Sequence, residues 1–155
     1  LLTAVCQAVH QLRVRLGSLE PRIVTEEFCK ALKTLPNLCP HFHLSLQSGS
    51  SRILALMKRK YNARQAMAAI ELLRKYIPNV KFTTDIIVGF PQESEEDFEE
   101  TVEFVKAAGF LTTHIFPADT QGKYRRPRSN QKRFFLQTDS SKVQLHPLLF
   151  PNGTA

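Results

Sequence analysis

The stretch TTDIIVGFPQESEEDFEE, residues 83–100, passes within a few residues from an apolar run, through Gly-Phe-Pro, to an acidic segment. A continuous apolar run is typical of a strand that is covered on both faces. Ser94, followed at once by carboxylates, is typical of a helix start, because its hydroxyl can cap the free amides. The stretch therefore predicts a strand over 80–90, a tight turn, and a helix that Gly109 ends in a left-handed conformation.

Strand and helix signals alternate along the rest of the chain up to residue 117. Helices are expected over 1–11, after Thr25, after Ser50 or Ser51, and after Asn62. Asn62 forms a capping-box pattern with Gln65. Strands are expected over 13–19, over 41–47 and from His114. Alternation at intervals of about thirty residues predicts right-handed βαβ units around a parallel sheet. The fold class is α/β with about four βα units, and both part of a (β/α) barrel and a doubly wound sheet fit the pattern.

Apolar spacing predicts which side of two helices is buried. Met67, Ile70, Leu73 and Tyr76 are the expected inner positions of one helix, and Phe98, Val102 and Val105 are those of the next. The acidic side chains of the second helix are interpreted as a solvated surface that suits the helix dipole: Glu95, Glu96, Asp97, Glu99, Glu100 and Glu103.

Charge is distributed unevenly along the 155 residues. The composition, with 43% hydrophobic and 23% charged residues, is that of an ordinary soluble domain, and the formal net charge is +7. Most of the excess lies in the tail 118–155, which includes Arg125, Arg126 and Arg128. We expect two parts, 1–117 as the folded domain and 118–155 as a divergent basic tail with little fixed structure. Any strong attraction to phosphate is expected to come from the tail.

The three cysteines, Cys6, Cys29 and Cys39, are widely and unevenly spaced. This spacing matches neither a disulfide framework nor a metal or iron-sulfur site, so buried structural thiols are the favoured interpretation. No apolar run reaches the length of a membrane span, and no signal-peptide pattern is present, so a cytoplasmic protein is expected. The chain begins without methionine, inside a helical pattern, and is interpreted as a fragment.

The carboxyl ends of the expected strands are the candidate binding site, because ligands bind there in parallel α/β proteins. These ends carry small and hydrogen-bonding residues at 17–21, 47–50, 89–93 and 116–117. Each loop alone is more simply explained as a turn, but several loops at one edge favour a binding mouth. Arg59 could bind a carboxylate or phosphate, although a surface cation is the simpler reading, and His41 and His43 are expected to be packed or edge histidines.

Four segments together resemble a known family: RLGSLEP (15–21), HFHLSLQSGSSRILALMKRKY (41–61), TTDIIVGFPQESEEDFEETVEFVKAAGF (83–110) and HIFP (114–117). They are similar to the later part of the radical S-adenosylmethionine domain of tRNA methylthiotransferases. The branch that acts on N6-threonylcarbamoyladenosine at position 37 is the most similar. The resemblance covers about residues 12–117 and implies a partial (β/α) barrel, here represented by roughly its last four strands.

This resemblance implies an enzyme that adds a methylthio group to C2 of the modified adenine in tRNA. The family uses a [4Fe-4S] cluster and S-adenosylmethionine to form a 5′-deoxyadenosyl radical, a second cluster in sulfur delivery, and a second S-adenosylmethionine as methyl donor. By position, Ser18 and Glu20 would lie near the methionine moiety or substrate, Gln47 and Ser48 near the ribose, and Arg59 near the carboxylate. The adenine pocket would be shaped by five residues: Gly89, Phe90, Pro91, Phe116 and Pro117.

The sequence also departs from the family pattern. It contains no Cys-x3-Cys-x2-Cys loop for the radical-generating cluster, and Gln92 stands where the family usually has the second glycine of GFPGE. After Pro117 the expected Tyr-Ser-x-Arg-like segment is replaced by the basic tail.

Three hypotheses follow. The chain is an incomplete tRNA methylthiotransferase, inactive alone; or a non-catalytic module whose tail binds tRNA; or a non-redox (β/α) barrel enzyme that binds an adenine-containing ligand.

Overall fold

The computed structural model describes residues 1–118, 134–139 and 142–147. The helices are α1 (Leu2–Ala8), α2 (Glu26–Lys33), α3 (Ser51–Leu56), α4 (Ala63–Tyr76) and α5 (Glu95–Ala108), with a 3-10 turn η1 (Pro21–Ile23). The strands are β1 (Val14–Leu19), β2 (Leu38–Gln47), β3 (Lys81–Val88), β4 (Thr112–Pro117), β5 (Phe134–Asp139) and β6 (Lys142–Pro147). None of the helices in these ranges is long and apolar enough to cross a membrane.

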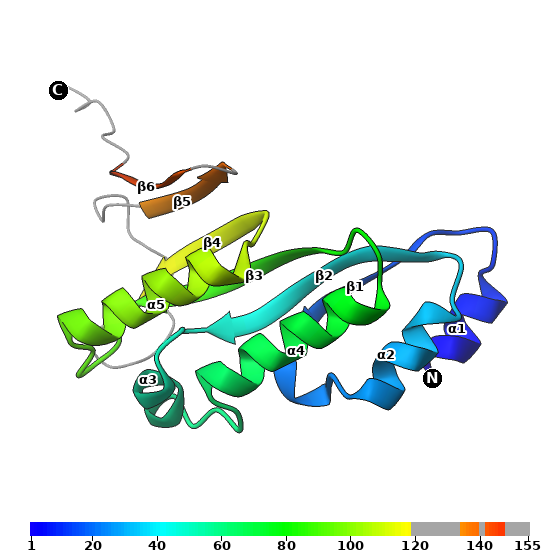
Figure 1. Ribbon diagram of the computed structural model, residues 1–155, viewed down its shortest axis with the longest axis horizontal. Helices are drawn as coiled ribbons and strands as arrows, with labels where there is room; N and C mark the ends of the chain where they lie inside the picture. Colours follow the sequence, from blue (N-terminus) through cyan, green and yellow to red (C-terminus); the bar gives the residue numbers. More distant parts are fainter. Residues whose placement is uncertain (119–133, 140–141, 148–155) are drawn as a thin grey trace, which may run out of the picture.

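The six strands form one sheet in the order β1-β2-β3-β4-β5-β6. β1 to β4 are parallel, with Phe42 opposite Phe82 and Thr84 opposite Thr113, whereas β5 and β6 join in antiparallel fashion beyond β4. Figure 1 shows α2, α4 and α5 along the same side of the sheet. Helices on a single side are typical of a (β/α) barrel, whereas a doubly wound sheet carries them on both. The predicted α/β class and partial barrel are therefore confirmed.

The hydrophobic core lies between the sheet and these helices. Side chains that are at most 1% exposed come from both layers: Phe42, Leu44, Leu46, Phe82 and Ile86 from the strands, and Ile70, Leu73, Val105 and Ala108 from the helices. Since successive strand residues point to opposite sides, every second residue of β2 and β3 enters this core. Burial of this apolar surface is the main force that holds the helices on the sheet.

The opposite side of the parallel strands has a different character. Strand alternation places Arg15, His41, His43, Asp85 and His114 there, and all five are half-buried or exposed. We call this side of β1 to β4 the polar face. In a closed barrel the corresponding side looks inward.

The helix caps form as the sequence predicts. Thr25 accepts a hydrogen bond from the amide of Phe28 at 3.1 Å, and Asn62 with Gln65 makes a reciprocal capping box. Ser94 caps α5 in a second box, with Asp97, and Gly109 ends that helix with φ of +57°. Ser50 is the exception: it occupies the N-cap position of α3, but its side chain caps no amide there.

Two boundaries differ from the sequence prediction. The first helix ends at Ala8 rather than residue 11, because the side-chain amide of Asn37 binds the carbonyls of Cys6, Val9 and Leu12 at 3.0–3.2 Å. The second strand begins at Leu38 rather than residue 41, since Leu38 already pairs with Val14. Both changes come from contacts between segments distant in sequence.

The buried side of α5 is also displaced from the predicted one. Phe98 and Val102 are only half-buried, whereas Asp97, Thr101 and Phe104 are buried along with the expected Val105. In α4, Ile70 and Leu73 are buried as predicted, while Met67 and Tyr76 lie at the flanks of the core. The cause in α5 is the β2–α3 turn, which packs on it: a Cβ added to Gly49 would lie 2.6 Å from Cβ of Phe104.

The tail is described only in part. Residues 134–139 and 142–147 form the β5–β6 hairpin, and Thr113 pairs with Leu136. The other residues beyond 118, including Arg125, Arg126 and Arg128, lie outside the described residues. The expectation of a poorly ordered tail stays a prediction.

Candidate functional site

The carboxyl ends of β1, β2 and β3 share an unusual backbone conformation. Ser18, Gln47 and Gly89 have φ of +53°, +75° and +69°. The left-handed region costs a residue with a side chain roughly 1–2 kcal/mol, and such strain concentrates at functional sites. We call these three residues the rim. Since parallel strands end at one edge of the sheet, the rim collects the positions that the sequence predicts for ligand binding.

Most of the predicted binding residues are accessible at this edge. Ser18 and Gly89 are exposed, and the others there are half-buried: Glu20, Gln47, Phe90, Pro91, Phe116 and Pro117. A Cβ added to Gly17 or Gly89 would meet no atom within 4 Å, so the backbone there is open to a ligand. The roles assigned to these residues stay predictions.

Ser48 lies apart from the accessible group. It is fully buried, its hydroxyl accepts a hydrogen bond from the amide of Ser50, and it lies 3.1 Å from the hydroxyl of Thr101. The structure therefore directs Ser48 toward α5, where it supports the turn after Gln47.

Arg59 and Glu20 both lie close enough to Tyr61 to affect its pKa. Burial raises the pKa of Tyr61 to about 12, with Arg59 opposing and Glu20 reinforcing the rise. The Tyr61 hydroxyl donates to the carbonyls of Ser45 and Leu46 at 2.7 and 2.9 Å. This contact fixes the loop that carries Arg59 to the end of β2, while Glu20 pairs with Arg22 at 3.6 Å.

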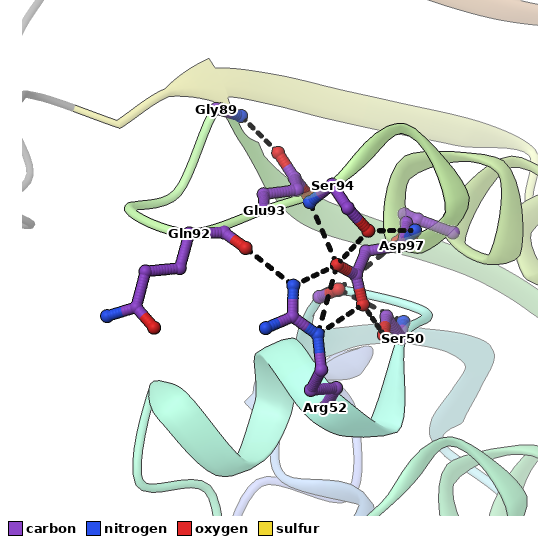
Figure 2. A network of polar contacts seen from close by, with 9 residues as sticks. Ser50, Arg52, Gly89, Gln92, Glu93, Ser94 and Asp97 are labelled. Atoms are coloured by element: carbon purple, nitrogen blue, oxygen red, sulfur yellow. Dashed lines mark hydrogen bonds and ion pairs between the residues drawn. The ribbon is translucent and has the colours of Figure 1, made fainter.

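A buried carboxylate joins the two turns that follow β2 and β3. Asp97, only 4% exposed, accepts hydrogen bonds from the hydroxyls of Ser50 (2.8 Å) and Ser94 (2.6 Å) and pairs with the guanidinium of Arg52. Figure 2 shows the carboxylate surrounded by these donors. We call the four residues the Asp97 cluster. The Arg52 contact, followed by those of Ser94, holds the pKa of Asp97 well below its usual range.

The cluster also reaches the backbone of the β3–α5 turn. Arg52 donates to the carbonyl of Gln92, and Gln92 has φ of +72°. The sequence departure at Gln92 therefore falls on a position whose conformation favours glycine. The guanidinium contact helps to hold the strained residue in place (Figure 2).

In the β3–α5 turn, the two carboxyl oxygens of Glu93 have different surroundings. Its Oε2 accepts a hydrogen bond from the Gly89 amide, and burial raises the pKa of its carboxyl group. Among the described residues no donor reaches the buried Oε1. A buried acceptor without a donor is costly, so this oxygen fits a hydrogen-bonding ligand or water at the rim.

These residues fit one expected cofactor and not the other. Open backbone at Gly17 and Gly89, with the free oxygen of Glu93, fits a polar nucleoside ligand such as S-adenosylmethionine. A [4Fe-4S] cluster finds no set of ligands, because Cys6 and Cys29 are buried in the core and Cys39 lies apart in β2. No group of three or more metal-binding side chains occurs in the described ranges.

Sequence reasoning missed the Asp97 cluster and the contacts of the polar face. The interpretation of Asp97 as one of the solvated acidic residues is wrong, because Asp97 is buried. One signal in the sequence pointed to Asp97. It lies three residues after Ser94, and this is the position of the acidic partner in a capping box. Asp85, an acidic residue within an apolar strand, was a second signal.

Comparisons with known proteins place these features in context. A family model described as "Radical SAM superfamily" matches residues 4–105. The tRNA-2-methylthio-N(6)-dimethylallyladenosine synthase of Chlorobaculum tepidum is 42% identical over 116 residues, covering 75% of this chain and 26% of the relative. The threonylcarbamoyladenosine tRNA methylthiotransferase MtaB of Thermotoga maritima is 47% identical over 104 residues, covering 67% and 24%. The chain thus spans about a quarter of the length of these relatives.

Two further comparisons bear on branch and fold. The tRNA-2-methylthio-N(6)-dimethylallyladenosine synthase of Clostridium tetani is also 47% identical over 104 residues, covering 67% of this chain and 23% of the relative. Among solved structures, coproporphyrinogen III oxidase (HemN) from Escherichia coli, described as a radical SAM enzyme, gives a TM-score of 0.62 at 15% identity. That alignment covers 75% of this chain and 27% of the other, and it supports the fold alone.

The first prediction concerns Gln92. Replacing it with glycine should raise the free energy of unfolding by about 0.5–1 kcal/mol, because the relief of left-handed strain exceeds the added flexibility of the unfolded chain. Urea denaturation followed by circular dichroism measures the change. Gln92→Ala is the matched control, since it removes the same side chain but keeps the strain. Equal stabilities of the glycine and alanine variants would contradict the strained turn.

The second prediction concerns Asp97. Its folded-state pKa is lowered, so its stabilising contribution is complete above the unfolded-state pKa of about 3.9 and is lost progressively as pH falls from that value toward the folded-state pKa. Asp97→Asn should therefore lower the thermal midpoint by several degrees at pH 7. The deficit should shrink below about pH 4, because Asp97 takes up a proton in the unfolded chain while it stays ionised in the folded one.

Glu99→Gln, a change at an exposed position of the same helix, is the control and should leave the midpoint unchanged throughout. A deficit for Asp97→Asn that stays constant from pH 7 to pH 3 would show that the charge of Asp97 does not stabilise the fold.

Proposed function

Because the chain belongs to the radical SAM superfamily, we propose that it forms the nucleoside-binding side of a tRNA methylthiotransferase. The observation that carries this proposal is the identity of 42–47% with tRNA-modifying relatives over 104–116 residues. The residues that the family model matches, 4–105, include the three rim residues.

We assign the rim and its neighbours to S-adenosylmethionine. The cofactor supplies, when bound beside a reduced cluster, the oxidising radical that activates the substrate carbon, and a second molecule supplies the methyl group. The side chain of Gln47 is suited to hydrogen bonds with ribose hydroxyls, and Arg59 to the carboxylate of the methionine moiety. Phe90 and Phe116, with Pro91 and Pro117, offer apolar surface to an adenine ring.

The residues of this chain perform binding and positioning in this proposal. Arg52 and Asp97 hold the β2–α3 and β3–α5 turns together, so that Gln47 and Gly89 keep a fixed separation before a ligand arrives. Preorganisation of this kind lowers the cost of binding. The cysteines do not fit an iron-sulfur cluster, so we derive no redox step from them, and we propose that the chain alone does not cleave S-adenosylmethionine.

For the substrate we propose tRNA, with N6-threonylcarbamoyladenosine at position 37 as the modified base. The support for this branch is the set of motifs quoted above, since relatives of both branches reach 47% identity. A tRNA substrate agrees with a cytoplasmic protein. A tRNA-binding role of the basic tail is a second candidate, favoured only by the charge of Arg125, Arg126 and Arg128, which lie outside the described residues.

The experiment uses the 155-residue chain with S-adenosylhomocysteine as a stable probe. In a titration of the ¹⁵N-labelled chain, we expect saturable shifts of the backbone amides of Ser18, Gln47 and Gly89. Gln47→Ala should weaken binding about tenfold through the loss of hydrogen bonds to a ribose. Gln11→Ala, an exposed change far from the rim, should leave binding unchanged.

The second arm adds iron, sulfide, reductant and S-adenosylmethionine to the same chain. We expect no 5′-deoxyadenosine above that of a protein-free control, measured by liquid chromatography. Release of 5′-deoxyadenosine would overturn the claim that the chain lacks a radical-generating site. Rim amides that stay unshifted at millimolar S-adenosylhomocysteine would overturn the claim that it binds the cofactor.

A further inference from the structure

A chain of polar contacts crosses the polar face from β1 to β3. The Arg15 Nε donates to Nδ1 of His41 at 2.9 Å, and Nε2 of His41 lies 3.5 Å from the hydroxyl of Thr83. That hydroxyl lies 3.0 Å from Nδ1 of His43, and Nε2 of His43 lies 3.1 Å from Oδ2 of Asp85. Five residues from three strands are thus linked in one path.

The donors along this path can be assigned a single direction. A guanidinium only donates, so Nδ1 of His41 is an acceptor and its proton lies on Nε2. Burial, and secondly the charge of Arg15, lowers the pKa of His41, in agreement with a neutral ring. His41 then donates to Thr83, and the Thr83 hydroxyl donates to Nδ1 of His43. The proton of His43 is left on Nε2, where it is donated to the carboxylate of Asp85.

The path ends at an acceptor that is only partly satisfied. His43 occupies Oδ2 of Asp85, and within the described part of the chain no hydrogen bond to Oδ1 is found. The side chains of His43 and Asp85 are 18% and 30% exposed, so the carboxylate is oriented by its neighbour and yet open to a ligand. Both ring nitrogens of His43 are used, which makes His43 a positioning residue and leaves Asp85 as the group that can bind.

Flat and apolar groups lie beside this acceptor. The ring of His114, opposite Asp85 on β4, is 6.1 Å from that of His43. Strand alternation places Ile87 on the same side, two residues nearer the carboxyl end of β3, and it is half-buried. An aromatic surface next to a carboxylate acceptor suits a planar ring that carries an N–H group at its edge.

We propose that Asp85 binds the substrate base, by accepting a hydrogen bond from an exocyclic N–H of an adenine that lies on the polar face, with His43 and Thr83 as its positioning residues. The inference rests on the proposed function and extends it, because it assigns a subsite on the polar face that is separate from the rim. A nucleobase that enters an enzyme pocket is read in this way, by hydrogen bonds at its edge and stacking on its ring.

The test compares two nucleosides that differ in this donor. N6-methyladenosine keeps one exocyclic N–H, whereas N6,N6-dimethyladenosine has none. Each is titrated into the 155-residue chain with saturating S-adenosylhomocysteine present, so that the rim is occupied first. The readouts are the ring ¹⁵N signals of His43 and the side-chain carboxyl ¹³C signal of Asp85.

N6-methyladenosine should shift both signals and bind about tenfold more tightly than the dimethyl nucleoside, the cost of an unmatched acceptor. Asp85→Asn should abolish this preference. The N–H of His43 would donate to the amide oxygen of the new side chain. The NH₂ group of that side chain would then face the base, and it is a donor like the exocyclic N–H of the base. Lys81→Gln, an exposed change at the other end of β3, is the control and should keep the tenfold preference.

Equal affinity of the two nucleosides for the wild-type chain would overturn the proposal, and this comparison needs no variant to fold. A preference that survives in Asp85→Asn would also overturn it. If S-adenosylhomocysteine shifts the rim amides while neither nucleoside reaches His43 or Asp85, this inference fails and the proposed function stands. If neither probe binds, both fail.

Discussion

The buried carboxylate of Asp97 is the interaction on which the candidate site depends. A charge that is 4% exposed must be compensated, and it is compensated from both neighbouring turns, by Ser50 and Arg52 on one side and by Ser94 on the other. A carboxylate at the first turn of α5 is also favoured by the helix dipole. Satisfying this one group therefore fixes where the chain runs after β2 and after β3, and so fixes Gln47 and Gly89.

Helix starts and ends that depend on neighbouring residues could be predicted from the sequence. The features that differed from the prediction depend on contacts between residues distant in sequence. The capping box of Asn62 and Gln65, the Ser94 cap and the left-handed Gly109 depend on residues within a few positions, so they could be predicted. The end of α1 depends on Asn37, and the burial of Asp97 and Thr101 depends on the turn at Gly49. Neither contact leaves a periodic signal in the sequence.

The site was predicted as a set of strand ends, and the structure adds what lies behind and beside them. Ser48 supports the turn from within, and Glu93 offers a free oxygen. The polar face was not foreseen as a unit, because it requires the register that sets Thr83 beside His43 and Asp85 opposite His114. The acidic residue within the strand of TTDIIVGFPQESEEDFEE becomes intelligible only in that register. In our proposal the chain has a rim that binds a cofactor nucleoside and a polar face that binds a substrate base.

The most direct measurement of this assignment is made on tRNA from cells in which the gene for this chain is disrupted. Nucleosides from total tRNA are separated and identified by mass spectrometry. The account predicts that the 2-methylthio group disappears from N6-threonylcarbamoyladenosine at position 37, with the unmethylthiolated nucleoside in its place. Full retention of that group, or its loss from the dimethylallyl nucleoside alone, would contradict the account.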